Sequence, residues 1–139
     1  MNIQFLNTGE WGIRRTIFDL YIERLKGHVP KVDGVLNVIF VDDVYIETLN
    51  RTYRNKEEPT DVLSFSYMED KDVRSDELIG EIYISVPTAK RQAEEFDIKL
   101  VDELNKLFVH GFLHIFGHDH EKDEDYKEMK KIEDEVLND

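Results

Sequence analysis

The sequence predicts an α/β fold of the α+β sandwich type, in which helices pack on a mixed sheet of about four strands. Short β-branched runs alternate with longer segments whose apolar residues recur at helical spacing, in the order βαβαββααα. The chain has 139 residues and 40% hydrophobic content, which suits one core. We therefore expect residues 1–139 to form a single domain.

The first half of the chain predicts two strands and two helices. An apolar run at 3–6 indicates a strand, and apolar residues at helical spacing over 11–25 predict one amphipathic helix. The β-branched run 35–41 fits a buried strand, and Asp42-Asp43 can cap the helix that follows. We expect the inner face of that helix to carry four apolar side chains, Val44, Ile46, Leu49 and Tyr53.

The second half predicts a hairpin followed by three helices. Strand-like runs at 62–67 and 78–85 flank a charged segment, which predicts a hairpin with a long solvated loop. From Pro87 onward the apolar spacing becomes helical. The three helices are expected at about 87–96, 100–116 and 123–137.

Composition excludes several classes of protein. The chain contains no cysteine, so disulfides, thiolate metal sites and a cysteine nucleophile are excluded, and a metal site must use His, Asp or Glu. The first residues lack the basic flank and long apolar run of a signal peptide, and no apolar stretch approaches the ~20 residues of a membrane span. We expect a cytoplasmic protein without a membrane partner.

The net charge of −13 argues against broad neutralisation of nucleic-acid phosphates, and no DNA partner is expected. The acidity is regional, however. Residues 1–60 carry 8 basic and 9 acidic side chains, whereas residues 61–139 carry 10 and 22. Arg51, Arg54 and Lys56 could therefore still form a local patch that attracts phosphate.

Four of the five histidines fall within eleven residues. His110 and His114 are four apart on a predicted helix, which places both imidazoles on one face. Gly117 can end that helix and turn the chain so that His120 approaches the same ion. The resulting spacing is the one by which a family of zinc proteases assembles three ligands, with water in the fourth position. Gly111 replaces the glutamate that serves those proteases as base, so peptide hydrolysis by that mechanism is not expected.

The sequence thus predicts a metal, zinc above all, held by His110, His114 and His120, although nickel or copper would bind the same nitrogens. The alternative is that these histidines are ordinary hydrogen-bonded residues. His118 is expected to pack or to contact substrate at the rim. Asp119 is interpreted as a partner of a ligand or as a helix cap.

A second group of polar residues surrounds Arg54. This arginine is expected near a helix end, beside a Pro-Thr-Asp turn at 59–61 that begins a buried strand, where it could clamp an anion through two contacts. Chemistry alone leaves an alternative open, in which Asp61 stabilises the turn and Arg54 is a surface ion-pair partner.

Taken together, these motifs resemble the YbeY-type endoribonucleases, also described as metal-dependent hydrolases and rRNA maturation factors. The resemblance spans nearly the whole chain. It is carried by Val41-Asp42-Asp43, Leu49-Asn50, Tyr53-Arg54, the run from Pro59 to Phe65, Gly80-Glu81-Ile82 and the stretch from His110 to His120. It implies one zinc ion per chain at His110, His114 and His120, and a functional arginine at Arg54. Ser66 and Glu81 depart from the Pro and Asp that are common in the family.

The resemblance also implies a function, zinc-dependent cleavage of single-stranded RNA. The expected substrate is an rRNA precursor, at the 3′ end of the small-subunit rRNA, and the expected partner is the small ribosomal subunit, with a role in ribosome quality control. The general base could be the zinc hydroxide, Asp61 or Glu81. The RNA 2′-hydroxyl is an alternative nucleophile. Two other readings remain: a zinc hydrolase of another small substrate, and a ribosome assembly factor in which zinc stabilises the fold.

Overall fold

The computed structural model describes residues 1–54, 60–68, 74–117 and 123–138, with the backbone alone at 123–126. The strands are β1 (Asn2–Leu6), β2 (Val35–Val41), β3 (Val62–Ser66) and β4 (Leu78–Ser85). The helices are α1 (Thr8–Trp11), the 3₁₀ helix η1 (Arg15–Phe18), α2 (Asp19–Lys26), α3 (Asp43–Arg54), α4 (Val86–Glu95), α5 (Leu100–Ile115) and α6 (Asp123–Asn138).

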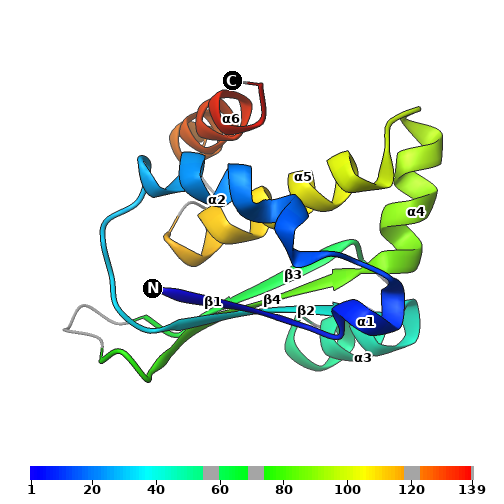
Figure 1. Ribbon diagram of the computed structural model, residues 1–139, viewed down its shortest axis with the longest axis horizontal. Coiled ribbons are helices and arrows are strands. Elements are labelled where there is room, and N and C mark those ends of the chain that lie inside the picture. The colour runs from blue at the N-terminus through cyan, green and yellow to red at the C-terminus, as the bar shows by residue number, and fades with distance from the viewer. Residues whose placement is uncertain (55–59, 69–73, 118–122, 139) are drawn as a thin grey trace.

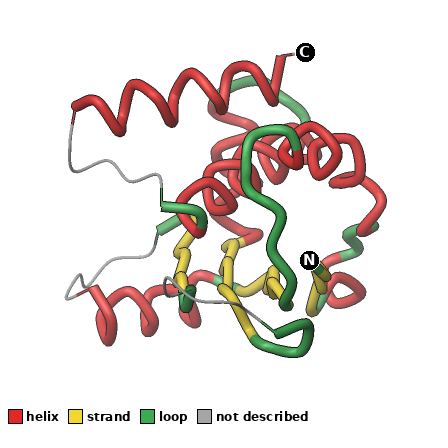
Figure 2. Tube along the Cα trace, turned by 90° about the vertical axis from the view of Figure 1, so that its left-hand side faces the viewer, coloured by secondary structure: helices red, strands yellow, loops and turns green. Residues whose placement is uncertain are grey.

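The strands form one mixed four-stranded sheet, as the sequence predicts, and their order in the sheet is β1-β2-β4-β3. Strands β1, β2 and β4 are parallel, and β3 pairs antiparallel with β4. The predicted hairpin of β3 and β4 is therefore confirmed. Helices α2, α5 and α6 lie on one side of the sheet and α3 lies on the other, with α1 beside it (Figure 1). Figure 2 shows α6 as the outermost of these helical layers.

Alternation along β2 divides the core between the two faces of the sheet. Leu36, Val38 and Phe40 are fully buried on the face covered by α5, where they join the main hydrophobic cluster. Ile39 and Val41 point to the other face and form a smaller cluster with residues of α3 and β3. The large core thus supports α5, the helix on which the predicted histidines lie.

Gly111 allows α5 to approach the sheet closely. A Cβ atom at this position would lie 2.8 Å from Cγ2 of Ile82 and 3.0 Å from Oγ of Ser64. A larger residue would therefore push α5 away from β3 and β4. This contact fixes the height of α5 above the sheet next to His110.

The prediction of a single helix over 11–25 is wrong. Gly12 adopts a left-handed conformation with φ +67° and ends α1, and its N–H donates to the carbonyl of Gly9. Arg14 is extended, and the chain then re-enters helical structure as η1 and α2. The apolar spacing persists across this break, because three short segments present their apolar residues to the same core.

The expected inner face of α3 is partly wrong. Ile46 is fully buried, but Val44 and Tyr53 are 72% and 65% exposed. The other buried residue of this helix is Asn50, which is polar. The cluster on this face of the sheet is small, so it covers only a narrow strip of α3.

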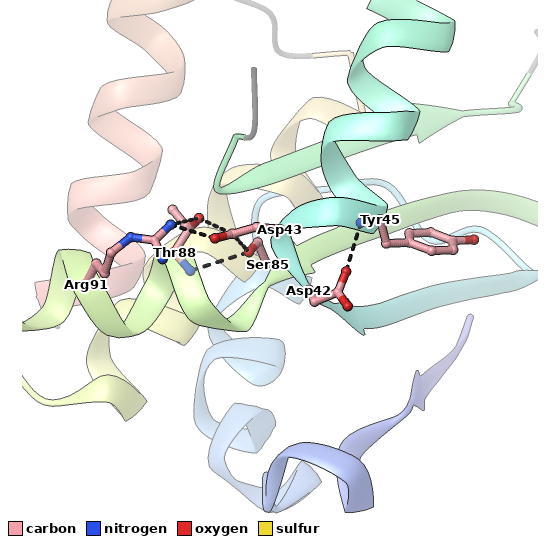
Figure 3. A network of polar contacts seen from close by, with 6 residues as sticks. All are labelled: Asp42, Asp43, Tyr45, Ser85, Thr88 and Arg91. Carbon is pink, nitrogen blue, oxygen red and sulfur yellow. Dashed lines mark hydrogen bonds and ion pairs between the residues drawn. The ribbon is translucent and has the colours of Figure 1, made fainter. Parts of the chain in front are cut away.

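The first turn of α3 is fixed by two aspartates (Figure 3). Oδ1 of Asp42 accepts the backbone N–H of Tyr45 at 2.8 Å, which confirms the predicted cap. The carboxylate of Asp43 accepts hydrogen bonds from the hydroxyls of Ser85 (2.6 Å) and Thr88 (2.7 Å). It also accepts one from the guanidinium of Arg91 (2.8 Å).

This network joins the start of α3 to the end of β4 and to α4. Burial acts to raise the pKa of Asp43, but the hydrogen bonds from Ser85, Thr88 and Arg91, together with the charge of Arg91, outweigh it. The pKa of Asp43 therefore lies below its ordinary value, so the carboxylate stays ionised and keeps its three donors.

In the part of the chain that is described, no helix has the length and apolar character needed to cross a membrane.

Candidate functional site

His110 and His114 lie one turn apart on α5, on one face of the helix as predicted. Their Nε2 atoms are 3.1 Å apart, and the ring centroids are 4.6 Å apart. Two nitrogens that each bind a zinc ion at ~2.0–2.1 Å in a tetrahedral site lie roughly 3.3 Å from each other. The separation observed here therefore fits two ligands of a common ion.

Glu133 on α6 holds the ring of His110 from the other side. Its Oε1 lies 2.5 Å from Nδ1 of His110, and both side chains are half-buried. When Nδ1–H donates to this carboxylate, Nε2 is left with its lone pair free for a metal. Histidines that bind metals generally donate their other N–H to a carboxylate, a carbonyl or water, so this contact is the support that a ligand requires.

Glu133 was not among the residues predicted from the sequence. A signal was present, because Met129, Ile132 and Val136 form the apolar stripe by which α6 packs on the core, and Glu133 falls within it. A carboxylate among inward-facing positions needs a polar partner. Which partner it meets depends on how α6 crosses α5, which spacing along one helix does not predict.

The end of α5 has the expected turn. Gly117 adopts φ +92°, and its N–H donates to the carbonyl of His114 at 3.1 Å. The chain thus leaves the helix in the left-handed conformation that the sequence predicted at this glycine. His118, Asp119 and His120 lie outside the described residues, so His120 stays a predicted ligand. Within the described ranges, no three His, Asp or Glu side chains form a metal-binding group.

Arg54 ends α3 beside the outer edge of β3. Its Nη2 donates to the carbonyl of Ser64 at 2.8 Å, and its guanidinium lies 5.3 Å from the centroid of the Phe65 ring. In the described part of the chain its partners are thus a carbonyl and an aromatic ring, whereas the ion-pair alternative requires a carboxylate. The side chain is exposed, so guanidinium donors remain accessible from solvent.

Ser64 connects the two predicted groups. Its carbonyl accepts from Arg54, while its hydroxyl oxygen lies where a Cβ atom on Gly111 would meet it, at 3.0 Å. Gly111 directly follows His110. The structure therefore brings the end of α3 and the histidine turn of α5 to the same edge strand.

The two carboxylates considered as bases lie elsewhere. Residues alternate between faces along β4, and Gly80 and Ile82 pack against α5, so Glu81 points to the opposite face from His110. Asp61 accepts from Gln92 at 3.3 Å and raises the pKa of Glu103 by its charge. Glu103 precedes His110 by two helical turns, or about 10 Å along α5. Neither carboxylate adjoins the histidine pair.

The proteins that match this chain are named endoribonucleases. They define the class of protein to which this fold and site belong. The family model of endoribonuclease YbeY matches residues 13–139. The endoribonuclease YbeY of Carboxydothermus hydrogenoformans is 44% identical over 104 residues, covering 75% of this chain and 71% of its own. That of Oceanobacillus iheyensis is 42% identical over 128 residues, covering 84% and 83%. This chain belongs to the endoribonuclease YbeY family.

The fold is also shared with a solved structure. The solution structure of TM1509 from Thermotoga maritima matches with a TM-score of 0.57 and 30% identity, covering 97% of this chain and 87% of that one. The family model and the curated relatives confirm the resemblance inferred from the motifs.

Proposed function

We propose that this chain is a zinc-dependent endoribonuclease that cleaves single-stranded RNA and holds one zinc ion per chain. The observation that carries the proposal is the 3.1 Å separation of the Nε2 atoms of His110 and His114, with Glu133 on the far side of the first ring. Membership of an endoribonuclease family supports the choice of RNA as substrate. His120 is the third ligand in this proposal.

In this proposal, each of the chain's own site residues has a separate role. Glu133 orients the ring of His110, and His114 is placed by the next turn of the same helix. Arg54 binds a phosphate of the RNA and stabilises the charge that develops on it, because its planar fork matches phosphate oxygens at two points. The zinc ion, when bound, supplies Lewis-acid polarisation of a phosphoryl oxygen and lowers the pKa of water.

The natural substrate, in this proposal, is an rRNA precursor at the 3′ end of the small-subunit rRNA, in the cytoplasm, with a role in ribosome quality control. The charge of −13 supports dependence on a partner such as the small ribosomal subunit, because the isolated protein attracts phosphates weakly. Substrate choice then comes from the assembly that presents the RNA.

The test is the end chemistry of a labelled single-stranded RNA incubated with zinc-loaded protein. A 2′,3′-cyclic phosphate would indicate attack by the 2′-hydroxyl, and a 5′-phosphate with a 3′-hydroxyl would indicate attack by water. His114→Ala should remove either product. Absence of any zinc-dependent cleavage by the parent protein would contradict the proposal and favour a non-catalytic assembly factor.

A further inference from the structure

A row of aromatic side chains lies on the face of the sheet that α3 covers. Tyr45 and Tyr53 occupy the same side of α3, two turns apart, and they are 51% and 65% exposed. Rings from β3 and β4, and one just after β3, lie on the sheet beside this helix. We call this group the aromatic surface: Tyr45, Tyr53, Phe65, Tyr67 and Tyr83.

Four of these rings form a continuous chain. Tyr45 stacks against Tyr83 with centroids 6.1 Å apart, and Tyr83 meets Phe65 edge-on at 6.0 Å. Phe65 in turn meets Tyr53 edge-on at 5.4 Å. The contacts hold the rings in place, while Tyr45 and Tyr53 keep half or more of their surface in solvent.

Packing alone does not account for this arrangement. Ile46 and Leu63 already fill the small cluster under α3, and Tyr45 and Tyr53 stand outside it. Contiguous exposed apolar groups on a protein surface mark an interaction site. Here the exposed groups are ring faces and edges rather than aliphatic chains, and unpaired RNA bases stack on such rings.

Glu81 orients two of the rings. Its carboxylate accepts hydrogen bonds from the hydroxyl of Tyr67 at 2.7 Å and from that of Tyr83 at 3.0 Å. Burial, followed by these hydrogen bonds, raises the pKa of Tyr67 to about 12 and raises the pKa of Tyr83 as well. Both hydroxyls therefore stay protonated at any working pH and keep donating to Glu81.

The aromatic surface lies on the opposite face of the sheet from His110, and it meets the proposed site at Arg54, beside the edge strand β3. The guanidinium of Arg54 lies over the ring of Phe65, so the donors of this arginine adjoin the rings. Tyr45 and Tyr53 are separated by eight residues of helix, or about 12 Å, which is the length of roughly three stacked nucleotides.

We propose that the aromatic surface binds the unpaired bases of a short single-stranded segment of the RNA, next to the phosphate that Arg54 receives. The inference rests on the proposed function and adds a base-stacking site to it. Stacking on rings tolerates any base but requires that the face of the base be exposed, as it can be in a single strand. The surface thereby favours single strands over duplexes without reading sequence.

The experiment measures binding of a fluorescent 2′-O-methyl oligouridylate of twelve nucleotides by anisotropy, with a gel to verify that the probe stays intact. The double variant Tyr45→Ala/Tyr53→Ala should bind at least about 25-fold more weakly, at about fivefold for each lost ring. Tyr45→Phe/Tyr53→Phe should bind like the parent, because the ring is retained. Phe96→Ala is the matched control, since Phe96 is 52% exposed and contacts Lys106 instead of this surface.

A backbone of the same length without bases separates stacking from charge. The parent and the double alanine variant should bind this abasic probe equally. Equal binding of the base-bearing probe by parent and double variant would overturn the inference. Retained RNA binding with lost association with the small ribosomal subunit would overturn it too, and would assign the surface to a protein partner. If the alanine variant melts early, Tyr45→Leu/Tyr53→Leu replaces it and should lose binding equally.

Cleavage by the same proteins distinguishes the two proposals. A parent that binds through the rings but does not cleave would refute the proposed function and leave the aromatic surface standing. A parent that cleaves, with variants that bind and cleave at the parental rate, would refute the aromatic surface alone.

Discussion

Glu133 lies 2.5 Å from Nδ1 of His110, so a carboxylate on α6 holds a histidine that precedes it by 23 residues. We expect Glu133→Gln to weaken zinc binding by roughly 10- to 100-fold, because the amide lacks the negative charge that makes the ring a stronger ligand. Competition with a chromophoric chelator measures the affinity. Glu128→Gln removes the same charge from an exposed position of α6 and should change little. Equal affinities of the two variants would refute the supporting role of Glu133.

Arg54→Lys should lower the cleavage rate by about 100-fold, because a single ammonium cannot reproduce a planar two-point contact with phosphate. Zinc content should not change, since the side chain contacts Ser64 and Phe65 rather than the histidines. Single-turnover cleavage at matched salt is the measurement, and Arg51→Lys, exposed on the same helix, is the control. Parental cleavage by the Arg54 variant would remove this residue from the reaction.

His120 and His118 should differ although their chemistry is the same. The third ligand has to point back over the face of α5 that carries His110 and His114, and the spacing after Gly117 assigns it to His120. His120→Ala should therefore lose stoichiometric zinc and some thermal stability, whereas His118→Ala should keep its zinc. Native mass spectrometry of both variants decides between them. Zinc lost without His118, or kept without His120, would identify another third ligand.

Glu103 should make the folded state less stable as pH rises. The side chain is 1% exposed, and burial raises its pKa, with the charge of Asp61 adding to the rise and Lys106 opposing it. Above the unfolded pKa of about 4.3, the unfolded chain has released a proton that the folded chain retains, so the free energy of unfolding falls through the interval up to the folded pKa. Below that interval this effect is absent.

Glu103→Gln should remove this pH dependence. Relative to the parent, the melting temperature of the variant should rise progressively as the pH is increased from about 4 to 7. Exposed Glu95→Gln, on α4, is the control for loss of one charge. A difference from the parent that is constant over the whole range would show that Glu103 titrates alike in both states.

The sequence predicted the elements whose signals are local. The β-branched run of β2, the cap at Asp42 and the glycine turn at Gly117 each depend on a few neighbouring residues, and each is confirmed. The prediction of one helix over 11–25 was wrong because Gly12 ends the first helix without interrupting the apolar spacing. One residue's backbone freedom there outweighed a pattern spread over fifteen.

The remaining differences have a tertiary origin. Val44 and Tyr53 are apolar positions of a helix, but they are exposed because α3 covers only a small cluster on its side of the sheet. Glu133 was missed for a related reason, because its partner lies on another helix. Spacing within a helix predicts which residues share a face; it does not predict which neighbouring element that face meets.

The position of Arg54 also bears on the open edge of the sheet. Strand β3 is at one edge of the sheet, and its outer side offers backbone groups to which a strand from a second molecule could pair. Arg54 occupies the carbonyl of Ser64 on that side and places a charge there. A strand arriving from another copy would have to displace the guanidinium from this carbonyl. The arginine proposed to bind the RNA phosphate thus also places a charge on the sheet edge where a further strand would pair.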